Sequence, residues 1–181
     1  MKHRLDRTMH KETMDDCSAI QIRPARLADA ADLLPLIRAY YRFDGIRFRA
    51  RPIALALARM LKDRRLGCAW IFRDGTRLAG YVLLSFNFDL ELGGFEGLVT
   101  DLFVREEYRG RGLGRRALAI VDEYCRSMGI TTVELQVVED NREAQEFYRG
   151  VGFKRLNRIV MTRAVKARAG RGRASVLVEG K

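Results

Sequence analysis

Hydrophobic positions in the first part of the chain predict one strand and two helices. Residues 20–23 predict a strand, and the apolar side chains that follow recur at helical spacing. That helix carries Leu27, Ala31, Leu34, Ile37 and Tyr41, and it should end at Asp44 and Gly45. A second helix is expected over residues 53–62.

Alternating patterns in the middle of the chain predict a hairpin and a further strand. Strands are expected over residues 68–72 and 78–86, joined by a turn at Asp74 and Gly75. Polar residues and glycines over 87–94 should form a loop, and residues 98–104 a strand.

The last part begins with an amphipathic helix, expected over residues 113–128 and ended by Gly129. A buried strand should follow over residues 132–138, Asn141 should open a short helix, and residues 153–161 should supply one or two closing strands. The pattern predicts one domain over residues 19–163. Residues 1–18 should be mobile, and residues 164–181 a basic, disordered tail.

The segment between the strand at 98–104 and the helix at 113–128 is rich in glycine and arginine. Glycines at 110, 112 and 114 allow positive φ angles and close approach of a ligand, and a helix N-terminus follows them. Arg109, Arg111, Arg115 and Arg116 add positive charge. We therefore interpret residues 109–115, called the phosphate loop below, as a pyrophosphate site.

Two other interpretations of this loop were weighed. Gly112, Gly114 and Ala117 also fit a loose dinucleotide fingerprint, and Glu134 lies twenty positions after Gly114. However, a polar segment separates the strand from the glycines, and Glu134 lies inside its strand rather than at the end. A plain connecting turn is the simplest alternative, but it needs neither three spaced glycines nor four arginines.

Two motifs in this chain resemble those of the GCN5-related N-acetyltransferases. Arg109-Gly-Arg-Gly112-Leu-Gly114 matches the Arg/Gln-x-x-Gly-x-Gly/Ala signature, and residues 141–153, with Asn141, Tyr148 and the Gly152-Phe153 ending, resemble the second signature. The match extends over about residues 19–163 and is closest to uncharacterised bacterial members. It implies a mixed α/β fold, with a mostly antiparallel, splayed central sheet flanked by helices.

The resemblance implies acetyl-CoA as co-substrate and assigns residues to it. The pantetheine arm would pair with the backbone of Leu102, Phe103 and Val104, where a bulge would free N–H groups. The pyrophosphate would bind Arg109, Gly110, Arg111, Gly112, Leu113, Gly114 and Arg115. Asn141 would contact the cofactor, cap its helix, or do both. Tyr148 matches the usual general acid, although it could also simply pack at a rim.

The general base is less determined than the other roles. Asp101 is the first candidate, because many relatives carry an acidic pair on this strand where this chain has Thr100 and Asp101. Strand alternation places these two on opposite faces, and Asp101 could instead be a buried structural carboxylate. Glu96, Glu134 or a water chain are alternatives, whereas His3 and His10 lie in the N-terminal segment and are not expected to serve.

The sequence says little about which molecule would accept the acetyl group. Aromatic and acidic side chains could line its cleft, namely Tyr40, Tyr41, Phe43, Asp44, Phe48, Phe86 and Phe88, of which Tyr41 and Phe86 fit the core better. A polyamine would require several converging carboxylates from Asp44, Asp89, Glu91 and Glu96. We expect transfer to a primary amine of a small molecule or protein by direct attack on the thioester. A basic binding module without turnover and a nicotinamide dinucleotide-binding protein are the alternatives.

Charge and cysteine content narrow the partners. The chain of 181 residues has a formal net charge of +11, much of it in the C-terminal tail, and the phosphate loop accounts for several core arginines. Nucleic acid is therefore not an expected partner, and a homodimer is left open.

Apolar runs fall far short of the roughly 20 residues of a membrane span, so a cytoplasmic location is expected. Cys17, Cys68 and Cys125 predict neither a disulfide nor a metal site.

Overall fold

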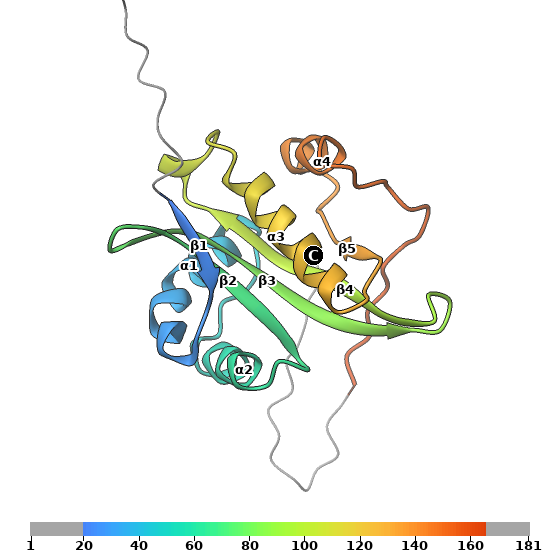
Figure 1. Ribbon diagram of the computed structural model, residues 1–181, viewed down its shortest axis with the longest axis horizontal. Coiled ribbons are helices and arrows are strands. Elements are labelled where there is room, and N and C mark those ends of the chain that lie inside the picture. The colour runs from blue at the N-terminus through green and yellow to red at the C-terminus, as the bar shows by residue number, and fades with distance from the viewer. Residues whose placement is uncertain (1–19, 166–181) are drawn as a thin grey trace, which may run out of the picture.

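The computed structural model describes residues 20–165, and its centre is one five-stranded sheet (Figure 1). The strands are β1 (Gln21–Pro24), β2 (Gly67–Asp74), β3 (Arg77–Asp89), β4 (Gly94–Val104) and β5 (Val133–Leu135). They lie in sequence order, and all neighbours are antiparallel except β4 and β5, which are parallel. The expected mixed α/β fold is confirmed.

Helices cover both faces of the sheet, and each face has its own apolar core (Figure 1). On one face pack α1 (Ala30–Phe43), which follows the short η2 (Leu27–Asp29), and α2 (Ala50–Lys62). On the other face pack α3 (Leu113–Ser127), preceded by η3 (Glu106–Tyr108), and side chains from α4 (Arg142–Arg149). Alternate side chains of the central strands divide between the two cores, because successive residues of a strand point to opposite faces.

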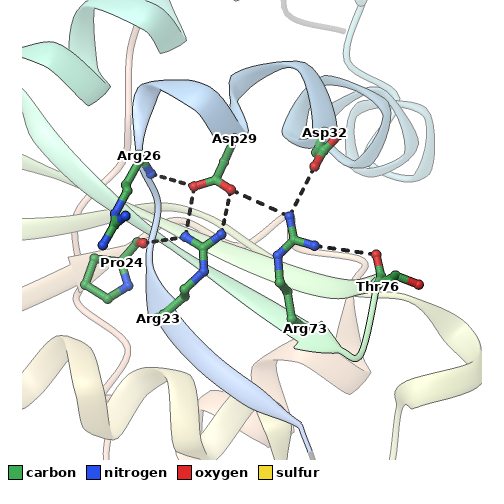
Figure 2. A network of polar contacts seen from close by, with 7 residues as sticks. All are labelled: Arg23, Pro24, Arg26, Asp29, Asp32, Arg73 and Thr76. Carbon is green, nitrogen blue, oxygen red and sulfur yellow. Dashed lines mark hydrogen bonds and ion pairs between the residues drawn. The ribbon is translucent and has the colours of Figure 1, made fainter.

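The start of α1 is fixed to the sheet edge by a polar network (Figure 2). Arg23 on β1 donates to both carboxylate oxygens of Asp29 at 2.7 and 2.9 Å, and Arg73 on β2 pairs with Asp29 and Asp32. The backbone N–H of Arg26 adds a bond of 2.8 Å to Asp29. These donors, Arg23 first, lower the pKa of the buried Asp29 carboxyl to about 2.

Two predictions about strand boundaries are wrong. Half of the expected loop at 87–94, namely residues 87–89 and 94, is strand. The hairpin extends this far because Phe88 packs edge-on against Phe95 at 5.1 Å and Asn87 Nδ2 donates to Glu96 at 2.8 Å. The buried strand expected over residues 132–138 is only Val133–Leu135, because β4 offers it only three partners before the two strands diverge.

The closing strands expected over residues 153–161 do not form. A strand needs a partner edge, and β5 is three residues long. Leu156, Ile159 and Met161 are exposed instead, and Arg158 pairs with Glu91 near the β3–β4 turn. The predictions for residues 1–18, including His3, His10 and Cys17, and for the tail beyond residue 165 lie outside the described residues.

Candidate functional site

A β-bulge opens the sheet where the site lies. Leu83 on β3 pairs with Asp101 and Leu84 pairs with Val99, so Thr100 is an extra residue on β4. The strand β5 pairs with β4 only as far as Val99. Beyond the bulge, residues 101–104 of β4 still pair with β3 but no longer pair with β5. The sheet is therefore splayed between β4 and β5, as expected.

A pocket of about 260 Å³ lies in this opening. Its walls come from the end of α1, the last residues of β4, the phosphate loop, the segment after β5, and α4; they are Tyr40, Phe43, Asp44, Leu102, Phe103, Val104, Arg109, Gly110, Leu113, Gly114, Gln136, Val137, Val138, Asn141, Glu143, Ala144, Phe147 and Tyr148. The splayed backbone thus brings both sequence motifs to one cavity.

The phosphate loop has the backbone shape of an anion site. Gly110 and Gly112 have φ angles of 74° and 75°, a region that side chains other than glycine rarely adopt. A Cβ atom at either position would meet nothing within 4 Å, so conformation rather than crowding requires glycine there. Gly112 is the N-cap of α3, and the N–H groups of residues 113–115 precede the first helical hydrogen bond, from Arg116 to Gly112.

Gly114 has a different role from the other two glycines. It lies within α3 at an ordinary helical φ, and a Cβ atom there would come within 2.8 Å of Cζ of Phe147. The third glycine of the motif therefore lets α4 approach α3, and this contact closes the pocket wall.

Arg109 connects the phosphate loop to the end of α1. Its guanidinium lies 5.4 Å from the ring centroid of Phe43, and its Nε donates to the carbonyl of Val104 at 3.2 Å. Because all three residues line the pocket, Arg109 is the loop cation that faces the cavity.

The next two arginines along the chain after Arg111 contact other elements of the fold. Arg115 donates to the carbonyl of Gly150 at 3.0 Å, which ties α3 to the end of α4. Arg116 donates to the carbonyl of Ile20 at 2.7 Å, just before β1. The arginine cluster therefore combines structural contacts with charge near the loop.

Tyr108, the residue before the phosphate loop, is fixed to the end of β2 by a hydrogen bond. Its hydroxyl donates to Oδ2 of Asp74 at 3.0 Å, its side chain is buried, and the Arg111 guanidinium lies 5.5 Å from its ring centroid. The turn between β2 and β3 thus positions the residue from which the loop departs.

Asn141 caps the motif helix, as one of its two expected roles requires. Its Oδ1 accepts a hydrogen bond of 3.1 Å from the backbone N–H of Ala144, and its side chain borders the pocket. The cap uses only the oxygen, so the amide group of Asn141 retains donors for a ligand.

Tyr148 lies on the pocket wall between two aromatic rings, at centroid distances of 5.1 Å from Phe147 and 5.7 Å from Phe153. Burial, followed by the negative charge of Asp44, raises the pKa of its hydroxyl to about 12. The phenol is therefore protonated at neutral pH and can act as a donor. Packing and the proposed acid role are compatible in this position.

Asp101 is buried behind the pocket wall rather than on it. Its carboxyl is 7% exposed, accepts a hydrogen bond of 2.9 Å from the hydroxyl of Tyr81, and is not among the lining residues. Burial raises its pKa to about 6, the Tyr81 bond opposes this, and Asp44 adds to it. Its charge in turn contributes to the raised pKa of Tyr40, a lining residue whose own burial is the larger cause.

The alternative bases lie outside the lining. Glu96 is 6% exposed and bonded by Asn87, and Glu134 lies within β5 opposite Leu98. Neither side chain borders the pocket.

Only part of the expected acceptor lining converges. Tyr40, Phe43 and Asp44 line the pocket, whereas the other candidates pack elsewhere: Tyr41 and Phe48 against the α1–α2 core, Phe86 against Tyr124, and Phe88 against Phe95. Asp89, Glu91 and Glu96 are absent from the lining. Sequence reasoning missed residues 136–138, Glu143, Ala144 and Phe147, although Phe147 directly precedes the motif tyrosine and could have been included.

The residues that the structure describes offer neither a metal site nor a membrane span. Within residues 20–165, no group of three or more His, Cys, Asp and Glu side chains is placed to hold a metal ion. Nor is any helix of that range sufficiently long and apolar to cross a membrane. Cys68 and Cys125 are both buried, and burial raises the pKa of Cys68 to about 12.

Known proteins resemble this chain over most of its length. An uncharacterised N-acetyltransferase of Methanocaldococcus jannaschii is 28% identical over 135 residues, 74% of this chain and 60% of that protein. Thialysine N-epsilon-acetyltransferase of Mus musculus is 25% identical over 148 residues, 77% of this chain and 86% of the mouse protein. The chain spans about half the length of other curated relatives that it matches.

A solved structure and a family profile agree with these matches. The crystal structure of an integron cassette protein from the mobile metagenome of Cole Harbour Salt Marsh superimposes with a TM-score of 0.72 at 29% identity, covering 81% of this chain and 91% of that one. Residues 31–153, more than half of the chain, match the profile of the acetyltransferase (GNAT) family. With both motifs meeting at one pocket, the chain belongs to the acetyltransferase (GNAT) family.

Proposed function

We propose that this chain transfers the acetyl group of acetyl-CoA to a primary amine of a small molecule or protein, by direct attack of the amine on the thioester. One observation carries the proposal. The phosphate loop and the motif tyrosine border the same pocket, through Arg109, Gly110, Gly114 and Tyr148. A phosphate-binding module without turnover has no need of a half-buried phenol beside its anion site.

The residues present fit the cofactor. Open space over Gly110 and Gly112 leaves room for a pyrophosphate against the N-terminus of α3, where backbone N–H groups and the helix dipole favour an anion. The outer edge of residues 102–104, which β5 does not cover, suits pairing with the amide groups of a pantetheine arm. Asn141 would add a side-chain donor at the opposite wall.

Acetyl-CoA supplies an acetyl group on a thioester, whose sulfur leaves as the amine nitrogen bonds to the carbonyl carbon. In our proposal Tyr148 gives its proton to the departing sulfur, which its protonated state at neutral pH allows. Asp101 takes the proton that the amine loses, through an intervening water, because it lies behind the pocket wall. A carboxyl with a pKa of about 6 is ionised at neutral pH and still basic enough to accept a proton.

The acceptor is the least constrained part of the proposal. The mouse relative is named for the epsilon nitrogen of thialysine, which supports an amine of an amino acid or similar small molecule. A protein amine remains within the same reaction class.

The test is an assay of CoA release with a panel of primary amines. Tyr148→Phe should lower kcat by roughly 100-fold or more with little change in the KM for acetyl-CoA, which is the usual size of a general-acid contribution. Tyr41→Phe is the matched control, because Tyr41 packs in the α1–α2 core away from the pocket. Equal effects of the two substitutions, or no turnover with any amine, would contradict the proposal.

A further inference from the structure

Asp44 is a carboxylate on the pocket wall, and it lies next to Phe43, the residue that contacts Arg109. It follows the last residue of α1, and its backbone N–H bonds to the carbonyl of Tyr40 at 2.9 Å. Among residues 20–165, none forms an ion pair or hydrogen bond with the Asp44 carboxylate. This is notable in a chain with a net charge of +11.

Glu143, the other carboxylate of the pocket lining, is exposed in the first turn of α4, where the helix N-terminus offsets its charge. Three further carboxylates that lie outside the lining have partners. Asp101 is bonded by Tyr81, Glu96 by Asn87, and Glu91 pairs with Arg158. The surroundings of Asp44 also favour a positive ligand. The C-terminal end of α1 carries partial negative charge, and the aromatic ring of Tyr40 stands in the same wall.

The reacting nitrogen is a poor partner for this carboxylate. An amine must lose its proton before attack, and a neighbouring negative charge favours the protonated form. A carboxylate that remains ionised serves better to hold a cation that does not react. Besides burial, the charge of Asp44 raises the pKa of both Tyr148 and Asp101, so it acts close to the groups assigned to proton transfer.

We propose that Asp44 binds a second, unreactive ammonium group of the acceptor, so that the substrate class is primary amines carrying another cationic group a few bonds away, such as short diamines and basic amino acids. This inference rests on the proposed function. A long polyamine fits less well, because Asp89, Glu91 and Glu96 do not reach the pocket. Asp44 is the lining carboxylate that lies at the C-terminal end of a helix, and one such carboxylate matches one additional cation.

The experiment compares two probes, 1,4-diaminobutane and butylamine, which differ in the second amine. The wild-type kcat/KM should favour the diamine by about tenfold, beyond the factor of about two expected from its two equivalent nitrogens. Asp44→Asn should remove that preference, mainly by raising the KM for the diamine. Any effect of the lost charge on Tyr148 and Asp101 should change turnover of both amines by the same factor and leave their ratio unaffected.

Asp122→Asn is the control, because Asp122 is exposed on α3 and its replacement changes net charge equally. Thermal melts should show all variants folded. An equal loss for both probes in Asp44→Asn, or a wild type that does not distinguish the probes, would overturn this inference while leaving acetyl transfer intact. Absence of turnover with both probes, together with no binding of acetyl-CoA, would instead overturn the proposed function and this inference with it.

Discussion

The hydroxyl of Tyr81 donates a 2.9 Å hydrogen bond to Asp101 beneath the pocket, where both side chains are almost fully buried. The bond favours the ionised carboxylate, while burial favours the neutral acid and raises the pKa to about 6. If Asp101 accepts the amine proton, kcat/KM should rise with pH through an inflection near that value, because only the carboxylate is competent.

Tyr81→Phe should move this inflection upward by roughly one pH unit, since it removes a bond worth about 1.5–3 kcal/mol to the charged form and 1.36 kcal/mol corresponds to one pH unit. Asp101→Asn should abolish it and lower kcat. The measurement is the pH dependence of kcat/KM for an amine whose own pKa lies outside this range, at amine concentrations well below KM and with saturating acetyl-CoA. An unchanged profile in Tyr81→Phe would assign the inflection to another group.

The bond between Tyr108 and Asp74 should matter for the phosphates of the cofactor and not for its thioester. Tyr108→Phe removes a 3.0 Å bond that positions the phosphate loop. We expect the KM for acetyl-CoA to rise about fivefold, equivalent to the roughly 1 kcal/mol of a typical hydrogen bond. Acetyl-pantetheine, which has no phosphates, should be used as well by the variant as by wild type. Equal losses with both thioesters would indicate general destabilisation instead.

Gly114 should tolerate alanine poorly, although alanine is the better helix former by about 1 kcal/mol. The new Cβ would lie 2.8 Å from Phe147 Cζ, and overpacking costs about 1–3 kcal/mol. We expect net destabilisation of about 1 kcal/mol by urea unfolding, with weaker acetyl-CoA binding. Combining Gly114→Ala with Phe147→Leu should recover part of the stability, and a strictly additive double variant would argue against this contact.

Asp29 should stabilise the fold at neutral pH and lose this contribution in acid. Its pKa is lowered to about 2 by Arg23 and its other donors, so its contribution is present above the unfolded pKa near 4 and is lost as pH falls toward 2. Asp29→Asn should cost about 1–2 kcal/mol at pH 7, a value reduced for the solvent around the partly exposed Arg23. Urea unfolding at several pH values should show the wild type and the variant converging below pH 3.

Sequence reasoning located the helices and most strands, because each carries a clear apolar period. It predicted the splay and a bulge on β4 but not the extra residue Thr100, since register depends on how the chain pairs with β3. The closing strands predicted over residues 153–161 do not form, because the local sequence does not reveal that β5 provides so short an edge.

The sequence predicted the phosphate loop and the motif helix but not how their residues pack around the pocket. Glycines at 110 and 112 indicated a turn with positive φ, which local sequence encodes, and both adopt it. The contact between Gly114 and Phe147 and the position of Asp101 behind the wall depend on tertiary packing, which no local pattern specifies. The sequence offered Asp44, Asp89, Glu91 and Glu96 as candidate carboxylates, and of these four only Asp44 lines the pocket.

Every step of the proposed reaction requires that the pocket bind acetyl-CoA through the phosphate loop. Isothermal titration with acetyl-CoA, CoA, NADP and a short DNA duplex, at two salt concentrations, tests it most directly. We predict saturable binding of acetyl-CoA that Gly112→Glu abolishes, because a carboxylate at this N-cap would occupy and repel the pyrophosphate position. Absence of acetyl-CoA binding, with salt-sensitive DNA binding or retention of NADP in its place, would contradict the account.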